Sequence, residues 1–221
     1  MYRALLFKEL REVWWTGAIA SVILCCVVAN EVGLSLDVET YRPTLPSYVI
    51  VPFQTDGMES SVTVVSAALA VVLGLWQTLG ESVRGTWRYL RHRPIRFSML
   101  LLTKMATGLG ILFISTGAPI AIYLWWAMSE DLHGSPFEWR MAAPTLSGWL
   151  VSSTVYLAAF LFGIRQARWF GSWLWPLALP LPLLFASAQF GARIPGVNYI
   201  TLLCDFLLFG GILYAAGERD D

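Results

Sequence analysis

The chain has few charged residues for its length and many apolar ones. Charged residues make up 14% of the 221 positions and hydrophobic residues 57%, whereas soluble domains carry roughly 25% charged residues. A soluble fold of this size could not bury so much apolar surface, which excludes a soluble globular domain. The 15 basic and 15 acidic residues cancel, so the net charge does not indicate a nucleic-acid partner, and we expect none.

Side chains for catalysis or metal binding are also scarce. His92 and His133 are the only histidines, and both fall in predicted loops without metal-binding spacing. The cysteines Cys25, Cys26 and Cys204 lie in apolar runs without a CxxC motif, so we interpret them as small buried residues. The sequence contains neither a G-x-x-x-x-G-K-S/T phosphate-binding loop nor a G-x-S-x-G nucleophile motif. We therefore expect no catalytic residue, no metal site, no cofactor and no ATP hydrolysis by this chain.

Six apolar segments are each long enough to cross a bilayer, which takes about 20 mostly apolar residues. They are residues 14–35, 61–80, 98–128, 144–164, 171–189 and 197–216. These segments predict an all-α integral membrane protein with a single transmembrane domain over residues 1–221. Pro176, Pro180 and Pro182 interrupt the fifth segment, so a kinked helix followed by a short re-entrant piece is the alternative there.

Basic residues alternate between the two sides of this arrangement. The N-terminus and the connections 81–97 and 165–170 hold ten lysines and arginines, whereas the connections 37–60, 129–143 and 190–196 hold three. Because short cytoplasmic loops carry the excess of Lys and Arg, both termini are predicted to be cytoplasmic. This topology indicates a multi-pass protein of the plasma membrane or the bacterial inner membrane.

The first thirteen residues have an amphipathic pattern. One helical face carries apolar side chains and another carries charged ones, the apolar set being Tyr2, Leu6, Leu10 and Val13 and the charged set Lys8, Arg11 and Glu12. The pattern predicts a helix over residues 2–13 that lies on the cytoplasmic surface before the first span. The alternative is an N-terminal extension of the first transmembrane helix.

The stretch between the second and third spans carries the most specific pattern in the chain. An acidic residue is followed by Arg-Gly-Thr, a short apolar helix, a proline with an aliphatic neighbour, and a lysine that opens the next span. The matching residues are Glu81, Arg84, Gly85, Thr86, Leu90, Pro94, Ile95 and Lys104. Over these 24 residues the chain resembles the permease subunits of ABC-2 type transporters. Arg91 and Arg93 stand where that family more often has small or apolar residues, so the loop here is unusually basic.

This resemblance implies a function and a set of partners. In the family, the loop holds a short cytoplasmic coupling helix that docks on a separate ATPase subunit, and two permease subunits, identical or related, form the transport pathway. The expected contact residues are Glu81, Arg84, Gly85, Thr86, Leu90 and Pro94. Thr86 is suited to cap a helix and Pro94 to end one. Charge alone favours a basic loop that contacts anionic lipid head groups, whereas the combined spacing of the acidic residue, Gly-Thr, Pro and Lys favours a coupling helix.

Two other functions fit the same composition. The first is a membrane scaffold or assembly subunit that binds partners without transport, and the second is an intramembrane enzyme that acts on lipids. The enzyme would need converging polar residues, and we cannot assemble such a set from the spans. The first interpretation, an exporter permease subunit, is the one that uses the 81–104 pattern.

Asp205 is the one acidic residue near the middle of a predicted span. A central aspartate costs about 2.5–3.5 kcal/mol on insertion scales, so it should face protein or water and be either paired or protonated. Two roles remain open for it: a place on a substrate path, or a structural hydrogen bond to a neighbouring helix.

Overall fold

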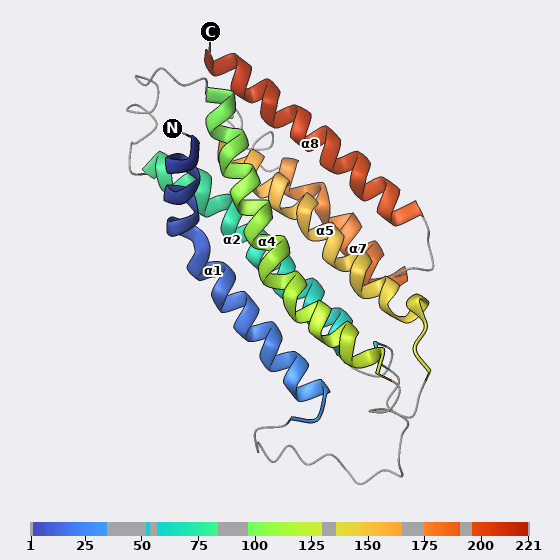
Figure 1. Ribbon diagram of the computed structural model, residues 1–221. Helices are drawn as coiled ribbons and strands as arrows, with labels where there is room; N and C mark the ends of the chain where they lie inside the picture. Colours follow the sequence, from blue (N-terminus) through green and yellow to red (C-terminus); the bar gives the residue numbers. More distant parts are fainter. Residues whose placement is uncertain are drawn as a thin grey trace.

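The computed structural model describes residues 2–34, 52–53, 57–83, 97–129, 136–164, 175–190 and 196–220, and the regular elements within these ranges are α-helices. They are α1 (Tyr2–Glu31), α2 (Met58–Val83), α4 (Phe97–Ala127), α5 (Trp139–Ile164), α7 (Pro180–Phe190) and α8 (Gly196–Asp220). The helices pack side by side in one bundle, and α1 begins at the end of the bundle where α8 finishes (Figure 1). The predicted all-α class is confirmed.

Five helices are long and apolar enough to cross a membrane: α1, α2, α4, α5 and α8. They correspond to five of the six predicted spans, and the chain is therefore a multi-pass membrane protein. The exception is the predicted span 171–189. There a helical turn at 175–178 stops at Leu179, and α7 then runs for only 11 residues.

The prolines explain why this segment is not one straight helix. Pro180 has no backbone N–H to donate, and its ring clashes with the carbonyl four residues earlier, which kinks or breaks a helix. Pro180 and Pro182 instead lie in the first turn of α7, where backbone N–H groups have no intrahelical partner anyway. At about 1.5 Å per residue, α7 is about 16 Å long, roughly half the hydrocarbon thickness of a bilayer.

Residues 2–13 belong to the same helix as the first span, because α1 continues without interruption from Tyr2 to Glu31. No glycine or proline occurs before Gly17 to break it. One face is buried along almost the whole helix, the residues being Glu9, Val13, Ala20, Leu24 and Val28. The structure thus favours the alternative of an N-terminal extension, and a separate surface helix is not observed.

The central helix of the bundle is α5. Every residue from Val151 to Phe162 is buried, which is the pattern of a helix covered on all sides. Helix α5 packs against α2, α7 and α8, and α1 packs against α2 and α4. The core is therefore built around α5, with α1 and α8 at the periphery (Figure 1).

Glycines allow α2 and α5 to approach closely. A Cβ atom on Gly74 of α2 would lie 2.8 Å from Ala159 Cβ and 2.9 Å from the Tyr156 carbonyl oxygen, both on α5. On the α5 side, a Cβ atom on Gly163 would overlap the Thr78 hydroxyl. Small residues at such contacts are a general means of packing helices in membranes, where the hydrophobic effect does not drive helix association.

Exposed tryptophans mark two levels along the bundle. Trp15 of α1 and Trp76 of α2 meet edge to face with ring centroids 5.8 Å apart, towards the end that holds the N-terminus. Trp125 of α4 and Trp139 of α5 are exposed at the opposite end. Indole rings favour the membrane–water interface. Lys104 lies about 31 Å from Trp125 along α4, close to the hydrocarbon thickness, so Lys104 lies near a membrane boundary.

We predict that Gly74→Ala lowers the free energy of unfolding by about 1–3 kcal/mol, because the added methyl group meets backbone atoms of α5 that cannot move alone. Reversible unfolding in mixed micelles would measure the change. Gly80→Ala on the same helix is the matched control, since a Cβ atom there meets nothing within 4 Å. Alanine at position 80 should stabilise α2 by up to about 1 kcal/mol. Equal effects of the two substitutions would contradict the close packing of α2 on α5.

Candidate functional site

The predicted coupling loop is reached by α2 on one side and α4 on the other. Glu81 lies in the last turn of α2, and α4 begins at Phe97. The other predicted contact residues lie outside the described residues: Arg84, Gly85, Thr86, Leu90 and Pro94. The structure does describe the part of both helices next to the loop, and a buried polar network lies there.

The centre of this network is an ion pair between Lys104 and Glu9. Lys104 Nζ lies 2.8 Å from Glu9 Oε2, and the two side chains are only 1% and 2% exposed. Removing a charged group from water costs several kcal/mol, so each of these charges depends on the other for its stability in the interior. The ion pair therefore fixes the first turns of α4 to the N-terminal part of α1.

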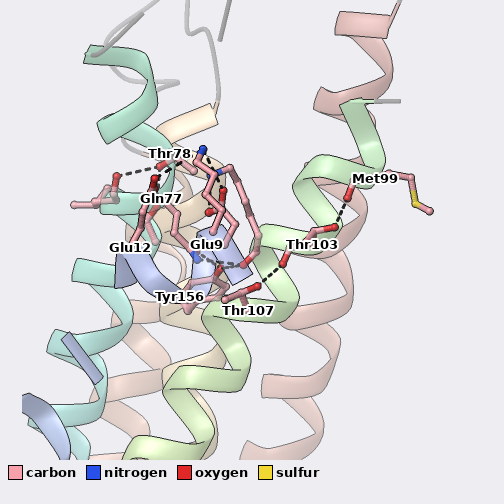
Figure 2. A network of polar contacts seen from close by, with 12 residues as sticks. Glu9, Glu12, Gln77, Thr78, Met99, Thr103, Thr107 and Tyr156 are labelled. Carbon is pink, nitrogen blue, oxygen red and sulfur yellow. Dashed lines mark hydrogen bonds and ion pairs between the residues drawn. The ribbon is translucent and has the colours of Figure 1, made fainter. Parts of the chain in front are cut away.

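Gln77 of α2 and Tyr156 of α5 extend the network to four helices, as Figure 2 shows. Gln77 Nε2 donates a hydrogen bond to the Lys104 carbonyl oxygen at 3.2 Å, and the Tyr156 hydroxyl donates to Gln77 Oε1 at 2.6 Å. All of these side chains are buried. Helices α1, α2, α4 and α5 are thus joined at one level, and we call Glu9, Gln77, Lys104 and Tyr156 the polar clamp.

Gly108 provides the space for the clamp. It lies one turn after Lys104 on α4, and a Cβ atom there would overlap the Tyr156 hydroxyl and lie 2.7 Å from Gln77 Oε1. A cavity of about 10 Å³ adjoins the clamp and is lined by Glu9, Glu12, Val13, Trp76, Gln77, Gly80 and Lys104. A space of that size holds one water molecule. The clamp is therefore closely packed and leaves no room for a larger ligand.

Beside the clamp, a second ion pair lies at the surface. Lys8 Nζ is 3.8 Å from Glu12 Oε1, and the side chains are 49% and 37% exposed. Such pairs contribute about 0–1 kcal/mol, whereas breaking a buried pair costs about 3–5 kcal/mol. The buried pair thus dominates the electrostatics of this end of α1.

An open apolar groove of about 320 Å³ runs between α1 and α4 on the same part of the bundle. Its lining residues are Leu6, Phe7, Leu10, Ala106, Thr107, Gly110, Ile111 and Ile114. Leu6 and Leu10 were predicted to rest on the membrane surface, and they line this groove instead.

The chemistry of the clamp is structural. Its charges neutralise each other, its hydroxyl and amide are hydrogen-bonded, and among the described residues no three His, Cys, Asp or Glu side chains gather to hold a metal ion. Comparisons with models of protein families, with curated proteins and with solved structures give no match to this chain.

The cysteines differ from the expectation that they are buried, because Cys25 and Cys26 are exposed and Cys204 is half-buried. None of them contributes to the clamp.

The sequence interpretation identified Lys104 as part of a motif but missed Glu9. A signal was available, because Glu9 continues the buried stripe of α1 formed by Val13, Ala20, Leu24 and Val28 at helical spacing. An acidic residue on an inward face requires a partner. Lys104 is one of only two lysines in the chain, and the other, Lys8, precedes Glu9 on α1 and lies 4.0 Å from its Oε1 atom.

Asp205 lies in a separate polar contact, between α8 and the middle of α5. Its Oδ2 atom is 2.6 Å from Ser153 Oγ, and its Oδ1 atom is 2.6 Å from Thr154 Oγ1. Both contacts join α8 to the central helix. Of the two roles left open from the sequence, these contacts correspond to the hydrogen bond between helices.

We predict that Lys104→Met lowers the free energy of unfolding by about 3–5 kcal/mol, because Glu9 remains buried without its counter-charge. Reversible unfolding in mixed micelles would measure the loss. The double variant Glu9→Leu, Lys104→Met should recover most of it, since no unpaired charge is left in the interior. Glu12→Gln is the control at the exposed pair and should change stability by less than about 1 kcal/mol. A double variant no more stable than Lys104→Met would show that the ion pair is not the source of the effect.

Proposed function

We propose that this chain is the membrane-spanning permease subunit of an ATP-driven ABC-2 type exporter, and that it couples to a separate ATPase subunit through residues 81–94. The observation that supports the proposal most is the position of the clamp. Gln77 and Lys104 lie on the two helices that lead into the loop, and they are hydrogen-bonded to each other through the Lys104 carbonyl.

This arrangement suits the transmission of a movement. A displacement of the loop acts on the last turns of α2 and the first turns of α4 together. Through Glu9 the same displacement reaches α1, and through Tyr156 it reaches the central helix α5. The four helices would then move as one rigid body, which is how domains commonly switch between two states.

The proposal includes the remaining parts of the transporter. The loop and both termini face the cytoplasm, as the distribution of basic residues indicates. Two ATPase subunits bind there, and a second permease subunit, identical or related, completes the pathway in the plasma or inner membrane. The sequence has no phosphate-binding loop, so ATP hydrolysis belongs to the partner. The separation of α7 from the turn at 175–178 fits a kink in the fifth predicted span.

We predict that an ATPase encoded beside this gene co-purifies with the full chain and that its ATPase activity rises in the complex. Arg84→Gln and the pair Gly85→Val, Thr86→Ala should abolish both effects while membrane insertion stays normal. Co-purification and ATP turnover in lipid nanodiscs are the measurements.

Arg140→Gln is the matched control for Arg84→Gln. Arg140 is exposed in the first turn of α5, and α5 begins at the opposite end of the bundle from the start of α1 (Figure 1). Its replacement should leave binding and ATP turnover unchanged. Equal losses at positions 84 and 140 would contradict docking at the loop. An ATPase that binds without any change in turnover would instead identify a scaffold subunit.

A further inference from the structure

If Asp205 is ionised, its contact with α5 contains three oxygen acceptors but only two hydroxyl protons. Ser153 Oγ lies 2.6 Å from Asp205 Oδ2 and also 2.7 Å from the Leu150 carbonyl oxygen. Thr154 Oγ1 lies 2.6 Å from Asp205 Oδ1. These three short oxygen–oxygen contacts are three full hydrogen bonds only if three protons are available, and each O–H group supplies one.

The count of protons depends on the state of Asp205. If the carboxyl is ionised, only the Ser153 and Thr154 hydroxyls supply protons, and one contact between two oxygen acceptors is left without any. If Oδ2 carries a proton, it donates to Ser153 Oγ, Ser153 donates to the Leu150 carbonyl, and Thr154 donates to Oδ1. All three contacts are then hydrogen bonds.

Among the residues that the structure describes, none supplies a counter-charge to Asp205. Helix α8 contacts α4, α5 and α7, and the positive side chains on the described parts of these helices are Lys104 and Arg140. Lys104 is paired with Glu9, and Arg140 begins α5 about 20 Å along the helix from Ser153. Asp205 forms no ion pair with any residue that the structure describes. Its titratable neighbour on α8 is Cys204, and an unpaired negative charge at this depth is costly.

We propose that Asp205 is a proton-binding site in the middle of the membrane: a neutral carboxylic acid that donates to Ser153 and accepts from Thr154, and so holds α8 on the central helix. The outer face of α8 is exposed and apolar, and its inner face also packs into the core through Leu208, Ile212 and Ala216. Loss of the proton would break the hydrogen-bond pattern and place a charge between the helices. This inference does not depend on the permease function.

The deciding experiment is an infrared difference spectrum between the full wild-type chain and Asp205→Asn, both in lipid vesicles at neutral pH. The carbonyl stretch of a protonated carboxyl group, with its isotope shift in deuterated water, should be present in the wild type and lost in the variant. A spectrum with only a carboxylate band at Asp205 would overturn the proposal.

Stability gives a second, independent test. Asparagine reproduces the pattern of a neutral acid, since its Nδ2 donates to Ser153 and its Oδ1 accepts from Thr154, so Asp205→Asn should keep the wild-type ratio of folded to unfolded protein. Asp205→Leu loses both hydrogen bonds between helices and should lower that ratio about threefold for each. Gly210→Ala is the control on α8, where a Cβ atom meets nothing within 4 Å. An asparagine variant as unstable as the leucine variant would contradict the proposal.

Discussion

The buried ion pair between Glu9 and Lys104 is the constraint on which the rest of this end of the bundle depends. Two charges removed from water remain stable only while they stay together, and separating them costs about 3–5 kcal/mol. The hydrogen bonds of Gln77 and Tyr156 are neutral and contribute about 0.5–1.5 kcal/mol each. Helices α1 and α4 are therefore joined most strongly, and α2 and α5 are joined to them by weaker contacts.

This order of strengths matters for the proposed coupling. The two helices that lead into the loop are joined by the hydrogen bond that Gln77 donates to the Lys104 carbonyl oxygen. A force on the loop cannot act on α4 without also acting on α1, because the ion pair resists separation. The weaker contacts would then carry the displacement from this rigid pair to α2 and α5, so that the four helices move together between two states.

The sequence predicted the helices well where length and apolar composition decide, and poorly where packing decides. Five spans follow directly from runs of about 20 apolar residues. The segment around Pro180 was expected to be irregular, and the prolines account for its division into a turn and α7. Glu9 and Lys104 are 95 positions apart, and no local pattern gives their pairing. The role of Gly108 is equally hard to predict from the local sequence, because it depends on a tyrosine from another helix.

The two polar sites illustrate one rule about charge and depth. Near the membrane boundary, Glu9 has a lysine 2.8 Å away, so both groups keep their charges and the pair is strong. At mid-depth, Asp205 has only hydroxyl partners among the described residues, and hydroxyl groups cannot neutralise a charge. The cost of an unpaired charge is highest there. A proton on Asp205 removes that cost and at the same time completes the hydrogen bonds, so the same physical requirement that pairs Glu9 with a lysine favours a neutral acid in the centre of the bundle.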